Sequence, residues 1–153
     1  MTFRIESPAF PSGAAIPARH TCDGENLSPR LSWEGVPEGA GSLALICEDP
    51  DAPRGTWSHW VLFDLPASVA SLPEGIPGSE RIEDGGVQGI NDSNRAGYDG
   101  PCPPGGTHRY FFRLYALDGK LSLPASSRRA DLLRAMAGRI LAEAELMGTY
   151  SRP

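Results

Sequence analysis

The sequence lacks the features that mark several large classes of protein. Its apolar runs are far shorter than a membrane span, and the N-terminus shows no basic segment followed by an apolar run. We therefore expect no stable membrane insertion and no secretory signal. Positive charge is also scarce, because 14 Lys and Arg residues stand against 19 Asp and Glu, a formal net charge of -5. This balance argues against nucleic-acid binding, so any bound anion must be held by a local site.

Cysteine and enzyme signatures are equally sparse. The three cysteines, Cys22, Cys47 and Cys102, are irregularly spaced and form no CxxC motif. Because an odd number cannot all pair within one chain, we interpret them as reduced thiols of a cytoplasmic protein, without structural zinc. The sequence contains no G-x-S-x-G elbow, no HExxH motif and no dinucleotide fingerprint. We therefore predict no catalytic residues, no metal and no cofactor.

What is present is the pattern of a loop-rich, mainly β protein. The chain of 153 residues is long enough for one core, and no linker or repeat divides it, which predicts a single domain over 1–153. Alternating side chains predict three long strands, at 42–49, 59–65 and 108–118. Shorter strands are expected within 3–7, 30–33 and 87–89.

One helix is predicted to close the chain. Leu132, Met136, Ile140 and Ala144 recur at four-residue spacing, and Gly148 suits the end of such a helix. The loops at 66–86 and 91–107 are longer than most connections in a compact domain, and loops of that length tend to be functional.

Three polar residues stand at strand ends on positions that alternation assigns to the core. Asp49 lies an even number of residues from Leu45 and so falls on the same strand face. In their own strands, His59 and His108 fall in the same way on the face of the alternating apolar residues. A buried charge needs a partner or a ligand. We expect Asp49 to orient the His59 ring and to favour its protonated form, so that both histidines offer N–H donors to an anion. Tyr110 would add a hydroxyl group.

Each of these residues also has a structural or alternative interpretation. His59 and Asp49 are equally compatible with a structural pair in the core. Asp49, His59 and His108 also have the composition of a two-His-one-carboxylate metal site, and hence of a metal-assisted hydrolase. His20 is expected to be exposed in a polar loop, and Asp51, which precedes Ala-Pro, to form a turn.

Several stretches resemble the phosphatidylethanolamine-binding protein family, also called Raf kinase inhibitor-like proteins. They are DPDAP, WSHW and GYDGPCPPGGTHRYFFRLYALD, together with TCDGENLSPRLSW and LMGTYSRP, which resemble the bacterial and archaeal branch. The resemblance covers nearly the whole chain in the right order. It implies a β-sandwich around a large central, mostly antiparallel sheet, with few helices and an anion pocket at one end of the strands.

The resemblance also implies roles for individual residues. Asp49, His59, His108 and Tyr110 match the pocket residues, and Trp57 matches a position in the pocket wall. The loop that lines the mouth is matched by Gly100, Pro103 and Pro104. This chain departs from many eukaryotic relatives in carrying Ser58-His59 where they have two consecutive histidines, and in its short RGT connection before Trp57.

These observations support a non-enzymatic module that binds a small anion such as phosphate or a phospho head group. The alternative is a regulator that inhibits a kinase or protease through the pocket rim, as family precedent suggests. Family habit among prokaryotic members further predicts a homodimer.

Overall fold

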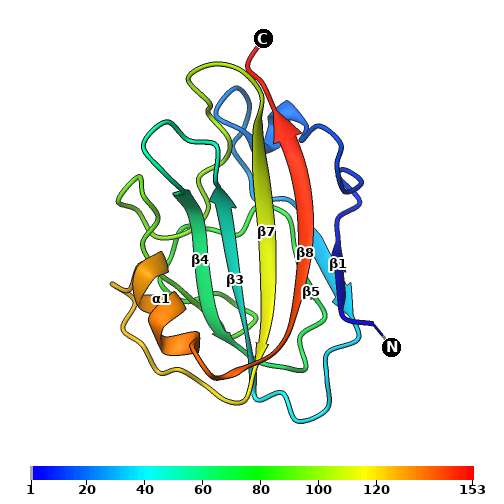
Figure 1. The fold of residues 1–153 in the computed structure, drawn as a ribbon, viewed down its shortest axis with the longest axis vertical. Helices are drawn as coiled ribbons and strands as arrows, with labels where there is room; N and C mark the ends of the chain where they lie inside the picture. The colour runs from blue at the N-terminus through cyan, green and yellow to red at the C-terminus, as the bar shows by residue number, and fades with distance from the viewer. Residues whose placement is uncertain (1) are drawn as a thin grey trace.

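The computed structural model describes residues 2–153 as two antiparallel sheets and one α-helix (Figure 1). The larger sheet has the strand order β6-β4-β3-β7-β8, and the smaller has the order β1-β2-β5. In chain order the elements are β1 (Arg4–Glu6), the 3-10 helix η1 (Ala18–His20), β2 (Leu31–Glu34), β3 (Ser42–Asp49), β4 (Trp57–Leu65), β5 (Ser71–Leu72), β6 (Val87–Gln88), β7 (His108–Leu117), α1 (Arg129–Met136) and β8 (Ile140–Tyr150). The predicted mainly β class with a large antiparallel sheet is confirmed. Within residues 2–153, no helix is long and apolar enough to span a bilayer.

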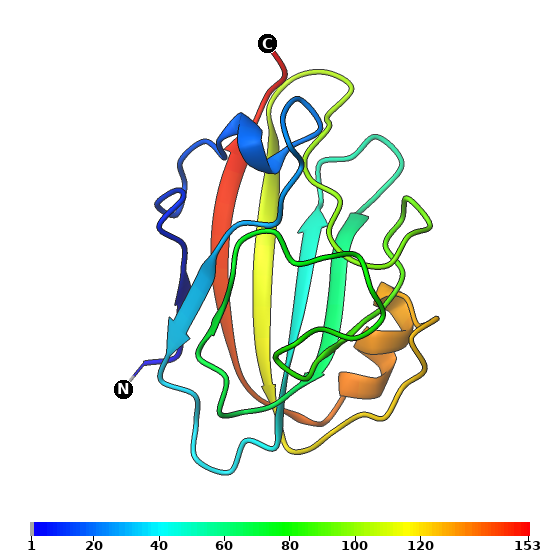
Figure 2. The same cartoon turned by 180° about the vertical axis from the view of Figure 1, so that it is seen from behind.

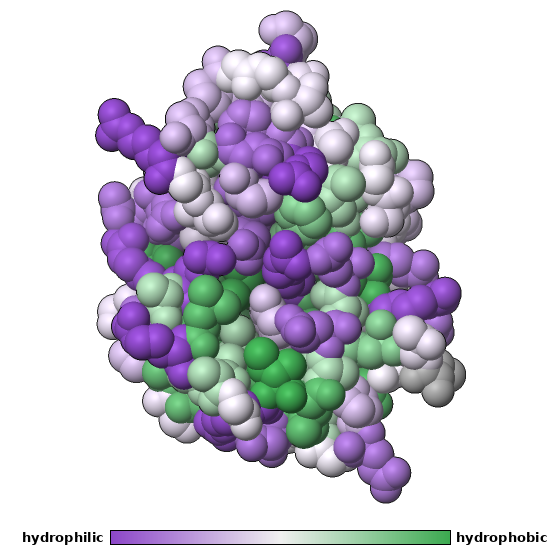
Figure 3. All heavy atoms as spheres, viewed as in Figure 1, coloured by the Kyte–Doolittle hydropathy of each residue, from purple (hydrophilic) through white to green (hydrophobic). Residues whose placement is uncertain are grey.

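The larger sheet forms the middle layer of the molecule. The smaller sheet and the loop between β5 and β6 cover one face (Figure 2), and α1 covers the other face beside β4. Leu45 and Trp60 belong to the core between the sheets, whereas Ile46 and Phe63 pack with Leu132 of α1 in a second core. Apolar residues also gather at the surface over and beside α1, in the lower half of Figure 3. Because both faces are covered, all eight residues of β3 are buried.

The predicted closing helix is correct only in its first half. The helix α1 ends at Met136, and residues from Ile140 onward form β8, which pairs with β7 along almost its whole length. Gly138 has a φ of +76°, the left-handed conformation that terminates helices. Ala144 and Leu146 of β8 both point into the core, as in an alternating strand. The apolar residues of this segment fit both the helical and the strand period, and the segment forms a strand because it pairs with β7. Gly148 therefore lies inside a strand and ends no helix.

Three connections meet at one end of the larger sheet, near the C-terminus in Figure 1. They are the β3–β4 loop, the segment 97–107 that leads into β7, and the loop that follows η1. The strand ends at Asp49, Trp57 and His108 point into the same region, because β3, β4 and β7 are adjacent in the sheet. This end of the sheet holds the candidate site.

Candidate functional site: a pocket at the strand ends

A cavity of about 530 Å³ opens between these connections. All eight residues that the sequence analysis selected line it: Asp49, Trp57, His59, Gly100, Pro103, Pro104, His108 and Tyr110. Its remaining wall includes Arg54 and two further acids, Asp92 and Asp99. The pocket therefore brings imidazoles, a phenol and carboxylates together under a rim of proline and tryptophan.

Asp49 pairs with His108, which corrects the expectation that it would orient His59. The Asp49 carboxylate accepts a hydrogen bond from His108 Nδ1 at 2.6 Å and another from the backbone N–H of Asp51 at 2.7 Å. Asp49 and His108 are 3% and 7% exposed. Because a carboxylate can only accept, it fixes a proton on Nδ1 and leaves Nε2 as the free nitrogen of His108.

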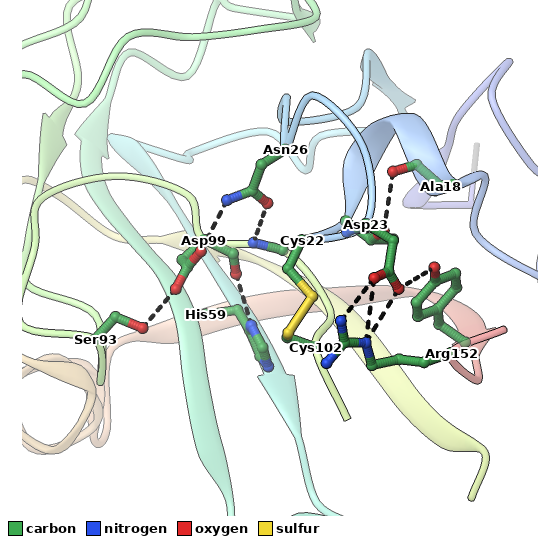
Figure 4. Close-up of a disulfide and its surroundings, with 12 residues drawn as sticks. Ala18, Cys22, Asp23, Asn26, His59, Ser93, Asp99, Cys102 and Arg152 are labelled. Atoms are coloured by element: carbon green, nitrogen blue, oxygen red, sulfur yellow. Dashed lines mark hydrogen bonds and ion pairs between the residues drawn. A yellow bond between two sulfur atoms is a disulfide. The ribbon is translucent and has the colours of Figure 1, made fainter. Parts of the chain in front are cut away.

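His59 is held by a backbone carbonyl instead of a side chain. Its Nδ1 donates to the carbonyl oxygen of Asp99 at 2.6 Å (Figure 4). Burial lowers the pKa of His59 below its usual range, and the Asp99 hydrogen bond and the nearby charges of Asp49, Asp99 and Asp92 only partly oppose this. The expected preference for the protonated ring is therefore wrong. The lowered pKa favours the neutral ring, whose Nε2 is an acceptor.

A β-bulge carries His59 into the pocket. The β3–β4 ladder pairs Cys47 with Trp60 and the next residue, Glu48, with Ser58, so His59 is the extra residue. Strict alternation would place His59 with Val61, which packs in the core beside α1. His59 therefore departs from the predicted alternation, although its ring does lie beside that of Tyr110, with the two ring centroids 5.3 Å apart.

Tyr110 supplies a hydroxyl group without a partner. Its ring lies edge-on to His59 and stacks on His108 at a centroid distance of 6.5 Å. The hydroxyl oxygen is buried and forms no hydrogen bond within residues 2–153. Burial raises the pKa of Tyr110, so the group stays protonated and able to donate. Buried polar atoms are nearly always paired in native proteins, so this hydroxyl is a free hydrogen-bond donor of the pocket, open to a water or to a ligand atom.

The rim is apolar and its loop is closely packed. Trp57 is 41% exposed and lies opposite Asp49 in the strand ladder. Gly100 donates its N–H to Asn26 Oδ1 at 2.8 Å, and a Cβ at this position would lie 2.1 Å from the His20 carbonyl oxygen. Only glycine permits this approach, which fixes the path of the mouth loop.

The metal hypothesis finds no support in the geometry. Within the described part of the chain, no group of three or more His, Cys, Asp or Glu side chains is arranged to hold a metal ion. One oxygen of Asp49 is taken by His108, whereas His59 turns its Nδ1 to a carbonyl group.

Comparisons with known proteins identify the family and the fold. The family model described as phosphatidylethanolamine-binding protein matches residues 6–151. The chain belongs to this family. A relative from Methanothermobacter thermautotrophicus, named only as a UPF0098 protein, is 55% identical over 97% of this chain and 98% of its own length.

Two solved structures of the family superpose closely on this chain. A structure described as a putative phosphatidylethanolamine-binding protein homologue from Chlamydia trachomatis has a TM-score of 0.91 at 43% identity and covers 99% of both chains. Escherichia coli YbcL, described as a new member of the mammalian family, has a TM-score of 0.93 at 34% identity and covers 100% of both. The predicted family resemblance is confirmed.

The interpretation of all three cysteines as reduced thiols is wrong. Cys22 and Cys102 form a disulfide with a sequence separation of 80, and Cys47 alone is a free, buried thiol. The argument for a cytoplasmic location from reduced thiols loses its basis, and the location stays a prediction. Spacing gave no signal for this pair, because the two cysteines come together only through the fold.

The sequence did not indicate the residues that support the loop carrying Asp99. The Asp99 carboxylate accepts hydrogen bonds from Asn26 Nδ2 at 2.9 Å and from Ser93 Oγ (Figure 4). His20, expected to be exposed, is 3% exposed and its Nδ1 bonds the Leu27 carbonyl oxygen at 2.9 Å. The length of the 91–107 loop was the one available signal, and it did not single out these residues.

Proposed function

We propose that the pocket binds a phosphate-like anion, free or as the head group of a larger molecule, and that the protein is a binding module and not an enzyme. The observation that carries this proposal is the buried, unpartnered hydroxyl of Tyr110 between two pocket imidazoles. A tetrahedral oxyanion would accept from this hydroxyl and from an imidazole, giving the short, strong hydrogen bonds of charged acceptors.

The charges of the pocket also restrict the ligand. Asp49, Asp92 and Asp99 line the same cavity as the imidazoles, so a bare dianion would meet three carboxylates. A ligand that brings a proton or an ammonium group reduces this repulsion. The head group in the family's name, phosphoethanolamine, combines both charges, which makes phosphorylethanolamine the first probe. The exposed Trp57 and the prolines at the mouth suit an organic substituent.

Phosphorylethanolamine should stabilise the wild-type protein against heat. With a dissociation constant of about 1 mM, about 10 mM ligand adds about 1.4 kcal/mol, or about 3–5 °C in Tm at this chain length. Tyr110→Phe should reduce the shift to about 1 °C or less, because a hydrogen bond to a charged group contributes about 1.5–3 kcal/mol. Differential scanning fluorimetry measures both values, and His59→Ala should lose the shift as well.

Ser58→Ala is the matched control for Tyr110→Phe. The Ser58 hydroxyl is also buried without a partner, but Ser58 does not line the pocket. This variant should keep the full ligand shift. Equal shifts in wild type and Tyr110→Phe, or no shift in wild type, would contradict the proposed ligand class.

Sulfate, a dianion without a proton near neutral pH, should bind more weakly than phosphorylethanolamine, and its binding should weaken further as pH rises. The Nδ1 proton of His59 is committed to Asp99, so Nε2 can donate to sulfate only when the ring takes up a second proton. The ligand-free pKa of His59 is depressed, so binding requires proton uptake over the neutral range. Affinity should fall by up to about tenfold per pH unit between about pH 6.5 and 8. Isothermal titration calorimetry tests this, with His59→Gln as the non-titrating control, whose profile should be flatter.

A further inference from the structure

The disulfide stands at the mouth of the pocket and is open to solvent. Cys22 and Cys102 are both exposed, and Cys102 lines the cavity. Figure 4 shows the bond joining the loop after η1 to the segment that carries Asp99. Cys47, by contrast, is fully buried in the core between the sheets. A thiol reagent in solution can therefore reach the disulfide and not the third cysteine.

The disulfide belongs to a row of contacts between the loop after η1 and the segment 99–102, and we call this row the seam. One end of the seam reaches the His59 ring. Beside the disulfide, Cys22 donates its N–H to the Pro101 carbonyl oxygen at 3.1 Å. Further along the same seam, Asn26 donates to the Asp99 carboxylate at 2.9 Å, and the carbonyl group of Asp99 receives His59 Nδ1 at 2.6 Å. The position of a pocket imidazole thus depends on how firmly these two loops are joined.

The mouth segment 103–107 depends on the disulfide for its anchorage. Across residues 2–153, hydrogen bonds attach Pro101 and the strand that begins at His108, but none involves the residues between Cys102 and His108. The segment reads PPGGT, and Pro104, Gly105, Gly106 and Thr107 are all exposed. Pro103 and Pro104 line the pocket from this segment. Because Pro103 is buried, the segment is held after the S–S bond opens only by the packing of Pro103 and by its two chain ends.

We propose that Cys22–Cys102 is a thiol–disulfide exchange site, and that its reduction loosens the pocket wall and weakens ligand binding. The co-reactant is a dithiol, either a small molecule or a protein. One thiolate of the dithiol attacks an exposed sulfur, forming a mixed disulfide and releasing the other cysteine as a thiolate. The second thiol of the reductant then displaces the remaining cysteine. Two electrons pass to the protein, which ends with two thiols, and the reductant ends as a disulfide.

The first test is whether the native protein exchanges. Wild-type protein is incubated with dithiothreitol, alkylated without denaturant and mapped by mass spectrometry. We expect Cys22 and Cys102 to be alkylated only after dithiothreitol, and Cys47 to be unmodified in both samples. A Cys22–Cys102 bond that resists dithiothreitol until the protein is unfolded would overturn the exchange site.

The second test follows the pocket wall by amide hydrogen exchange. The Asp99 N–H donates to the His59 carbonyl oxygen at 3.0 Å and the Gly100 N–H donates to Asn26, so both report on the seam. Reduction should speed their exchange at least about tenfold, and by more than that of core amides such as Leu114. Unchanged exchange at both positions, or a change no larger than that of the core, would overturn the loosening.

The third test connects the bond to the ligand and rests on the proposed function. Affinity for phosphorylethanolamine should fall by about tenfold on reduction, because the ligand must then order the wall itself. In Cys22→Ser/Cys102→Ser, affinity should equal that of the reduced protein and should not respond to dithiothreitol. Equal affinity in the oxidised and reduced wild type would overturn the link. If the oxidised protein binds no phosphorylethanolamine, the proposed function fails, whereas alkylation and hydrogen exchange still decide the exchange site.

Discussion

Replacing Cys22 and Cys102 by serine should lower the free energy of unfolding by about 4 kcal/mol. The cysteines are 80 residues apart in sequence, and a cross-link that closes so long a loop removes much entropy from the unfolded chain. At this chain length the loss corresponds to about 8–16 °C in Tm. Because both residues are exposed, the new hydroxyl groups are hydrated and add no burial cost.

Thermal unfolding of the oxidised wild type, the reduced wild type and the double serine variant measures this effect. The two forms without the disulfide should unfold at the same temperature. A difference below about 2 °C between oxidised and reduced protein would show that the unfolded chain is already compact around this loop. That outcome bears on global stability alone and is separate from the local exchange at Asp99 and Gly100.

Asp49→Ala should cost about 3 kcal/mol of stability. The substitution leaves the Nδ1–H of His108 and the N–H of Asp51 without their acceptor, and the His108 ring is buried. An unsatisfied buried donor costs about 1–3 kcal/mol, and this substitution leaves two donors without an acceptor. Asp49→Asn keeps an acceptor oxygen and should lose less.

Asp51→Ala is the matched comparison two residues away. Asp51 accepts two hydrogen bonds from the Arg109 guanidinium and one from the Arg109 backbone N–H, and these bonds lower the pKa of its carboxyl to about 2. The pair is partly exposed, so its removal should cost no more than about 1 kcal/mol. Urea unfolding at neutral pH compares the variants. Equal losses for Asp49→Ala and Asp51→Ala would show that the buried pair has no special weight.

Strand prediction succeeded where local pattern and tertiary packing agree. The alternation at 42–49 and 108–118 predicted β3 and β7 almost to the residue, and the short strands near 4–6, 31–34 and 87–88 were also found. The segment from Ile140 onward failed because its apolar residues fit two periods. Only pairing with β7 distinguishes them, and a single sequence does not display that pairing.

The sequence predicted the residues that line the pocket, but not how they are held there. Strand alternation predicted the burial of Asp49 and His108, but not that they pair with each other, because their partnership depends on the register between β3 and β7. The position of the His59 ring depends on a β-bulge, and a prediction from strict alternation has no place for an extra residue. The protein partner, the homodimer and the cytoplasmic location stay predictions.

The bulge at His59 adds one side chain to the pocket lining without changing the neighbouring pairs of the β3–β4 ladder. Without that one residue, Cys47–Trp60 and Glu48–Ser58 would be consecutive pairs of a regular ladder. The pairing of β3 with β4 on either side of the bulge therefore does not depend on His59. Deleting His59 would therefore remove one imidazole from the pocket lining and leave the ladder pairs on either side of it in place.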